Sequence, residues 1–210
     1  MKISFGHQLS FLFLSFLFIA CQPTKEAYEP LDSVVLENAF ERYKATEISA
    51  RRFGYETIAP LIAGRGDVFE KTELGKSVEG RPINALNFGE GNRKVLLWSQ
   101  MHGNESTATM ALFDLFNFLE GPSEDGFEYI RLAIREELLV RFIPMLNPDG
   151  AEQYVRRNAQ EIDINRDAIR QSSPEGIILK NARDDFEPEF GFNLHDQSKY
   201  YNAKGTALPA

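Results

Sequence analysis

Apolar residues recur along this chain with two different periods, and the period changes from one segment to the next. Ala108, Leu112, Leu115 and Leu119 follow the spacing of one helical stripe. Short apolar runs between glycine, proline and polar residues predict strands instead. The pattern predicts helices over 33–52, 107–119, 124–135 and 174–185, and strands over 69–74, 82–88, 94–99, 138–146 and 190–194.

The order of these elements predicts an α/β fold, because strands that alternate with helices are typical of layered α/β domains. The strands over 69–74 and 82–88 are joined by a glycine-containing turn, which predicts a hairpin. We therefore expect a mixed, mostly parallel central sheet flanked by helices. The polar stretch 147–172 has no clear period, and we expect a long surface loop there, of a length that is usually either functional or disordered.

The N-terminal segment differs in composition from the rest of the chain. Residues 9–20 are apolar and uncharged, a run shorter than the roughly 20 residues of a membrane-spanning helix but typical of a signal peptide. The only cysteine, Cys21, follows directly, which resembles a bacterial lipobox whose cysteine is lipidated. We expect a signal peptide over 1–20, a tether over 21–31 and an exported lipoprotein of the cell envelope that meets the membrane through its lipid anchor only. The alternative is a plain secretory signal with an incidental cysteine.

Composition and charge narrow the classes of function. Of the 210 residues, 43% are hydrophobic and 26% are charged, which is the balance of one globular domain with a core. The formal net charge is -8 and no run of lysine and arginine occurs, which argues against nucleic-acid binding, because such binding depends on basic surface. Removal of residues 1–20 takes His7 with it, so that His102 and His195 are the only histidines of the mature chain.

Both of these histidines lie just past the C-terminal ends of predicted strands, where open α/β sheets place their sites. His102 stands three residues before Glu105, and side chains at this spacing on a helical turn point the same way. Two histidines and one glutamate suit zinc and leave a position for water. The residue types alone also allow other divalent ions, or two histidines with purely structural roles. We predict a site for one metal ion at His102, Glu105 and His195.

Five short motifs follow one another along the chain. They are H-G-N-E (102–105), N-P-D-G (147–150), R-R-N (156–158), D-I-N-R (163–166) and N-L-H-D (193–196). Their order and rough spacing resemble those of the zinc carboxypeptidases of the carboxypeptidase A family, the funnelins. The resemblance covers about residues 70–200, and the five motifs together are far more specific than any one of them. It implies that residues 32–210 are the N-terminal part of a catalytic domain with the zinc-carboxypeptidase fold.

The resemblance implies a role for each residue of the metal site. His102, Glu105 and His195 match the zinc ligands of the family. Asp163 matches a carboxylate that orients the first metal histidine, a role that is physically reasonable because such partners fix the direction and tautomer of the ring. The implied cofactor is one zinc ion, which lowers the pKa of its bound water to about 7.

Three further residues match substrate contacts of the family. Arg156 matches the arginine that stabilises the tetrahedral oxyanion. Asn165 and Arg166 match the pair that holds the terminal carboxylate of the substrate, which a guanidinium can grip through two parallel hydrogen bonds. The implied partner is therefore a peptide with a free C-terminal carboxylate.

The activity that follows from the resemblance is hydrolysis of C-terminal peptide bonds through a metal-activated water. One alternative is a related zinc amidohydrolase or deacylase acting on N-acyl amino acids, because such enzymes share the His, Glu, His site and also bind a carboxylate. The other is a non-catalytic envelope lipoprotein that keeps the fold and binds peptide or metal.

Family members continue past the third ligand with a segment that supplies a glutamate as general base. Residues 196–210 contain no glutamate, so we expect a C-terminally truncated catalytic domain. General-base catalysis contributes typically about 100- to 10,000-fold to the rate. We therefore expect the 210-residue chain alone to bind zinc poorly and to hydrolyse little.

Overall fold

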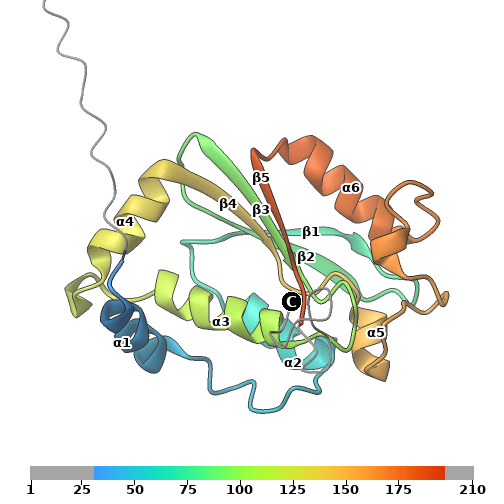
Figure 1. Ribbon diagram of the computed structural model, residues 1–210, viewed down its shortest axis with the longest axis horizontal. Coiled ribbons are helices and arrows are strands. Elements are labelled where there is room, and N and C mark those ends of the chain that lie inside the picture. Colours follow the sequence, from blue (N-terminus) through green and yellow to red (C-terminus); the bar gives the residue numbers. More distant parts are fainter. Residues whose placement is uncertain (1–30, 197–210) are drawn as a thin grey trace, which may run out of the picture. The chain divides into compact units, whose positions relative to one another are not determined.

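A mixed sheet forms the centre of the folded unit, which begins at Ser33. The computed structural model describes residues 31–196, and within them the sheet has five strands. Figure 1 shows this sheet with helices on both of its faces. In spatial order the strands are β1 (Glu70–Lys76), β2 (Pro82–Phe88), β4 (Leu138–Ile143), β3 (Arg93–Ser99) and β5 (Phe190–Leu194).

Four of these strands run in the same direction. β1 pairs antiparallel with β2 and β2 antiparallel with β4, whereas the pairs β4–β3 and β3–β5 are parallel. Only β2 opposes the others, and the predicted mixed, mostly parallel sheet flanked by helices is confirmed. Because β3 and β5 are parallel neighbours, their carboxyl ends meet at one edge of the sheet, where Ser99 lies opposite Leu194.

The helices agree with the predicted pattern where that pattern is strong. The helices predicted over 107–119 and 174–185 form within one residue of their expected bounds, and the helix predicted over 124–135 forms as a short 3-10 turn followed by an α-helix. The helical elements are α1 (Ser33–Tyr43), α2 (Tyr55–Ala63), α3 (Thr107–Leu119), η1 (Ser123–Asp125), α4 (Glu128–Glu137), α5 (Pro148–Gln153), η2 (Ile164–Arg166) and α6 (Pro174–Phe186).

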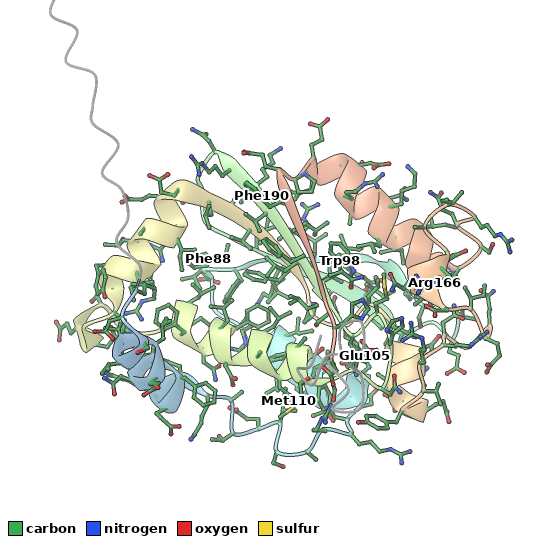
Figure 2. The ribbon with its side chains drawn as sticks, in the orientation of Figure 1. Phe88, Trp98, Glu105, Met110, Arg166 and Phe190 are labelled. Atoms are coloured by element: carbon green, nitrogen blue, oxygen red, sulfur yellow. The ribbon has the colours of Figure 1, made fainter. Side chains whose placement is uncertain are left out.

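Each face of the sheet carries its own apolar cluster, because alternate residues of a strand point to opposite faces. On one face, α2 and α3 bury Phe113 and Phe116 against Phe88 of β2. On the other face, α6 packs on a second cluster, which Leu96 and Trp98 of β3 join. Phe88 and Trp98, both labelled in Figure 2, thus belong to opposite sides of the sheet. The rigid sheet between the two clusters fixes where the strand ends lie.

The first helix is shorter than predicted. The helix expected over 33–52 ends at Tyr43, because the N–H of Ala45 donates to the side chain of Asp114 at 2.6 Å and no longer to a helical carbonyl. A tertiary hydrogen bond here overrides the local helical preference. α2 has no counterpart among the predicted elements, because its nine residues offer only two buried positions, one turn apart.

The stretch 147–172 is not a long surface loop, and that prediction is wrong. It contains α5 and η2, and its first five residues are buried. Asn147 accepts a hydrogen bond from the N–H of Gly150 at 2.9 Å, and Asp149 accepts one from the hydroxyl of Ser77 at 2.7 Å. Polar groups are buried readily where they find such partners, so their polarity did not indicate exposure.

Residues 1–30 and 197–210 lie outside the described residues. The expected signal peptide over 1–20, the expected lipidation of Cys21 and nearly all of the expected tether lie there and stay predictions. Of the helices within 31–196, none combines the length and the apolar character that crossing a membrane requires.

Candidate metal centre

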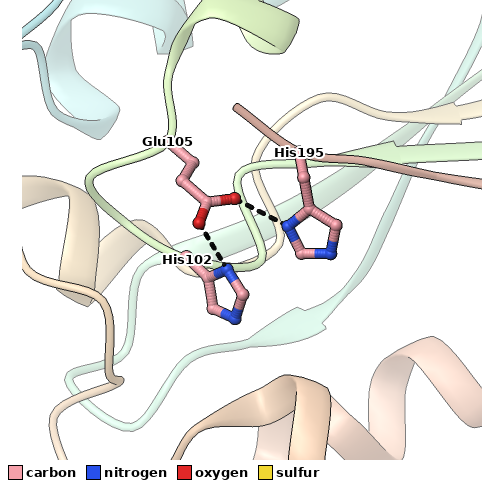
Figure 3. A group of neighbouring side chains, drawn as sticks. All are labelled: His102, Glu105 and His195. Carbon is pink, nitrogen blue, oxygen red and sulfur yellow. Dashed lines mark hydrogen bonds and ion pairs between the residues drawn. The ribbon is translucent and has the colours of Figure 1, made fainter. Parts of the chain in front are cut away.

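A tight turn after β3 carries His102 and Glu105. The N–H of Glu105 donates to the carbonyl of His102 at 3.0 Å, and both side chains leave the same side of the turn (Figure 3). The turn lies so close to α5 that a Cβ on Gly103 would stand 1.9 Å from the carbonyl carbon of Gly150. Gly103 of the H-G-N-E motif therefore allows two backbones to touch, which any larger side chain at this position would prevent.

His195, which directly follows β5, completes a group of three side chains with His102 and Glu105. The Glu105 carboxylate bridges the two rings, with Oε1 2.9 Å from His102 Nδ1 and Oε2 2.6 Å from His195 Nδ1 (Figure 3). One candidate ligand atom from each residue lies within 4.8 Å of the others. The structure thus brings together the three residues named from the sequence, and their assignment as metal ligands stays a prediction.

The donor set and its surroundings fit zinc. His102 is buried, and its second ring nitrogen, Nε2, lies 3.1 Å from Oδ1 of Asp163. If Nε2–H donates to Asp163, Nδ1 presents a lone pair next to an oxygen of Glu105. Two neighbouring acceptors repel each other, and a cation bound by both atoms would stabilise them. A guanidinium N–H of Arg156 lies 3.1 Å from Nδ1 and supplies part of that positive charge. Two imidazoles and one carboxylate are a known zinc ligand set, and Asp163 stands where a carboxylate can orient the first ring.

The carboxylates of this group are held in their ionised form. Burial of Glu105 acts to raise its pKa, but hydrogen bonds from the rings of His102 and His195, when these rings are protonated, outweigh burial and lower the pKa to about 2. Burial of Asp163 also acts to raise its pKa, and the hydrogen bonds from Arg156 and His102 outweigh it, so that the pKa is lowered. Both groups are therefore charged at neutral pH, as a cation site requires.

Arg156 lies beside the three side chains with part of its guanidinium open to solvent. Its Nε donates to Asp163 Oδ2 at 3.0 Å, and its Nη1 lies 3.3 Å from Oε1 of Glu105. The side chain is 43% exposed, so one edge of the guanidinium remains accessible to a bound molecule. Donors that are held in place in this way can stabilise charge that develops during a reaction.

A buried asparagine holds the loop between Arg156 and Asp163. Asn158 accepts through Oδ1 from two backbone N–H groups of that loop, at 3.0 and 2.9 Å. Its Nδ2 donates to the buried carboxylate of Glu175 at 2.8 Å. Sequence reasoning assigned Asn158 no role, although the R-R-N motif contains it, because its partner lies on α6.

Asn165 and Arg166 lie on η2, and Asp163 connects this turn to the group formed by His102, Glu105 and His195. Oδ1 of Asp163 accepts from the N–H of Asn165 at 3.1 Å and also faces His102. Asn165 lines a cavity of about 200 Å³ between β3, β5 and α6. The neighbouring Arg166 is exposed (Figure 2), and within residues 31–196 its guanidinium makes no hydrogen bond or ion pair. A free guanidinium of this kind is suited to bind a carboxylate.

Asp167 fixes the start of α6 directly after this pair. Its buried carboxylate accepts from the N–H of Ser172 at 2.9 Å and from the N–H and hydroxyl of Ser173 at 2.8 and 2.7 Å. Burial opposes ionisation, but these hydrogen bonds outweigh it and lower the pKa of Asp167. The charged carboxylate thus keeps η2 next to α6.

We expect Asp167→Asn to lower the free energy of unfolding at neutral pH by about 1–3 kcal/mol, because the amide keeps one acceptor oxygen and loses the charge. A lowered folded-state pKa gives stability that is present above the unfolded pKa, about 4, and is lost as the pH falls through the folded pKa. The difference between the two proteins should therefore shrink in acid. Urea unfolding at a series of pH values measures it, and a difference that stays constant with pH would contradict the expectation.

Comparison with known proteins assigns the family. The model of the zinc carboxypeptidase family matches residues 55–199. The chain therefore belongs to the zinc carboxypeptidase family, and its fold is that of the metallocarboxypeptidases.

Individual relatives agree with this assignment. Carboxypeptidase E of Caenorhabditis elegans is 31% identical over 140 residues, which cover 54% of this chain and 29% of the relative. A metallo-carboxypeptidase of Pseudomonas aeruginosa, solved in complex with (2-guanidinoethylmercapto)succinic acid, has a TM-score of 0.59 and 27% identity over 68% of this chain and 40% of its own. A metallo-carboxypeptidase of Burkholderia cenocepacia has the same fold, with a TM-score of 0.62 and 24% identity over 68% of this chain and 41% of its own. This chain thus spans less than half the length of each relative.

Proposed function

We propose that the protein is a zinc-dependent metallocarboxypeptidase that hydrolyses the C-terminal bond of peptides. The observation that carries this proposal is the convergence of His102, Glu105 and His195 from two strand ends, in a chain of the zinc carboxypeptidase family. Because the chain spans less than half the length of the relatives named above, the proposal concerns the activity of the whole protein.

Each residue near the metal group has a chemical role in this proposal. Arg166 binds the terminal carboxylate of a peptide through two parallel hydrogen bonds, and Asn165 donates to the same group. Zinc, when bound, supplies an acidified water and polarises the scissile carbonyl. Arg156 stabilises the negative charge that develops on the carbonyl oxygen only in the transition state. Asp163 keeps Nε2 of His102 hydrogen-bonded, so that Nδ1 carries the lone pair that a metal ion would bind.

We expect Arg156→Ala to lower kcat for a peptide with a free C-terminus by about 100- to 1,000-fold with a smaller change in KM, because the lost interaction forms in the transition state. Arg157→Ala is the matched control, since the neighbouring guanidinium donates to the carbonyl of Glu161 at 2.7 Å and touches none of the three ligands. Steady-state kinetics of the complete gene product measure both variants. Equal losses of kcat in the two variants would count against the role of Arg156.

A substrate panel separates the proposed activity from its alternatives. A carboxypeptidase hydrolyses peptides with a free C-terminus and not their C-terminal amides, because Arg166 requires a carboxylate. Removal of zinc by a chelator should abolish the activity and added zinc should restore it. A preference for N-acyl amino acids would indicate an amidohydrolase, and peptide binding without turnover of any substrate would indicate a non-catalytic binding protein.

A further inference from the structure

The end of β5 needs more than strand pairing to hold His195 in place. Within the described residues β5 is an edge strand, paired with β3 alone. Its last paired residue, Leu194, lies opposite Ser99, and His195 is one residue further on. The hydrogen bond between His195 and Glu105 therefore depends on whatever fixes the chain just past the strand.

We propose that Asp196 is a positioning residue, which clamps the end of β5 to the N-terminus of α3 and thereby holds His195 against Glu105. The proposal rests on the proposed function in that His195 is taken as a metal ligand. The N-L-H-D motif contains Asp196, but the resemblance assigned it no role.

Asp196 is bonded through both its backbone and its side chain. Its N–H donates to Oε2 of Glu105 at 3.3 Å, the same oxygen that faces His195. Its Oδ1 accepts from the N–H of Thr107 at 3.1 Å and from the hydroxyl of the same residue. Its Oδ2 lies 2.6 Å from Nη2 of Arg51. The side chain is only 9% exposed, and hydrogen bonds are stronger where water is largely excluded.

α3 receives its N-terminal cap from Asp196 and not from its own sequence. Ser106 occupies the N-cap position, but its side chain makes no cap hydrogen bond and donates instead to the carbonyl of Arg51. The first turn of α3 contains no acidic residue. The carboxylate of Asp196 therefore meets the N–H of Thr107, the first residue of the helix, and the positive end of the helix dipole. Because α3 is packed into the core, it provides a fixed anchor for the end of β5.

Arg51 adds a contact from a part of the chain that precedes the family match. The match begins at residue 55, whereas Arg51 lies in the segment 44–54 between α1 and α2. Its guanidinium balances the charge of Asp196, but its side chain is 60% exposed. Exposed ion pairs contribute little, so we assign the main positioning effect to the contact between Asp196 and α3.

The first test is a double-mutant cycle on zinc affinity, measured by calorimetry with the complete gene product. Asp196→Ala should weaken zinc binding by about 10- to 100-fold, the range for residues that orient a metal ligand. In a His195→Ala background the same change should cost less than about twofold, because the ligand that the Asp196 side chain positions is then absent. Asp196→Asn keeps an acceptor for Thr107 and should recover part of the affinity. Equal losses in both backgrounds would overturn the proposal.

Asp184→Ala is the matched control. It removes an equal charge from an exposed position on α6, where Asp184 pairs with Lys180, and it should leave zinc affinity unchanged. A loss of affinity in this control as large as that of Asp196→Ala would show an effect of net charge and overturn the positioning role.

The second test needs no metal. ¹⁵N NMR of the histidine side chains in the metal-free protein should show the His195 resonances moving toward those of free histidine in Asp196→Ala, with those of His102 in place. Unchanged His195 resonances in a variant whose circular dichroism is native would overturn the proposal. A wild-type protein that binds no zinc, together with displaced His195 resonances in the variant, would overturn the proposed function and support the positioning role.

Discussion

Replacement of His195 by alanine is expected to weaken zinc binding by more than about 100-fold, because residues that only orient a ligand already contribute about 10- to 100-fold. His195 supplies one of the three candidate ligand atoms that lie within 4.8 Å of one another. Glu105→Gln should have an effect of similar size, since the neutral amide replaces the carboxylate that bridges Nδ1 of the two rings. Calorimetric titration of the metal-free protein with zinc measures both losses.

Thermal unfolding gives an independent measure of the same loss. A ligand that binds only the folded state raises the unfolding temperature according to its affinity. Zinc should therefore raise the unfolding temperature of the wild-type protein and leave the unfolding temperatures of His195→Ala and Glu105→Gln unchanged. Glu161→Gln is the control, because Glu161 is an exposed acidic residue in the loop between Arg156 and Asp163 and is not one of the candidate ligands. Wild-type zinc affinity in His195→Ala and Glu105→Gln would place any metal site elsewhere and end the peptidase proposal.

Replacement of Gly103 by alanine is expected to lower the free energy of unfolding by about 3 kcal/mol or more, at the upper end of overpacking effects. The added Cβ would stand 1.9 Å from the carbonyl carbon of Gly150 and 2.3 Å from the backbone nitrogen of Ala151. Both neighbours are backbone atoms, which cannot turn away as a side chain could. The turn with the first two metal-site residues and the start of α5 must therefore separate.

Gly191→Ala is the matched control for this change. A Cβ on Gly191 meets only the ring of Trp98, at 3.5 Å, which is an ordinary contact. We expect this variant to stay within about 1 kcal/mol of the wild-type protein, the range for a glycine whose backbone accepts alanine. Urea unfolding of the metal-free proteins compares the two variants. Similar small losses in both would show that the backbones at Gly103 and Gly150 move apart at little cost.

Elements with a strong local pattern could be predicted from the sequence. The helix over 107–119 has the bounds of α3, and the apolar runs before His102 and His195 form β3 and β5. Helical stripes and short apolar runs are periodic within a few residues, so they are legible without any tertiary contact. The pairing of His102 with Glu105 was predictable for the same reason, since the two residues are three apart.

The predictions that were wrong concern segments whose local structure depends on a residue far away in the sequence. α1 ends early because Ala45 bonds to Asp114, 69 residues away. The stretch 147–172 is largely ordered and partly buried because its polar side chains find partners in the β1–β2 turn and on α6. Such partners leave no periodic trace in the sequence, and whether a polar group is buried depends on them.

By itself, the sequence determined the α/β class, the order of strong elements and the five motifs that identify the residues of the candidate site. Only the tertiary structure decided that His195 reaches Glu105 across 90 residues and that Asp163 reaches His102 across 61. It also decided that Asp196 caps α3. The physical reason is that residue types and spacing act locally, whereas convergence depends on the parallel pairing of β3 and β5 and on the packing that fixes their ends.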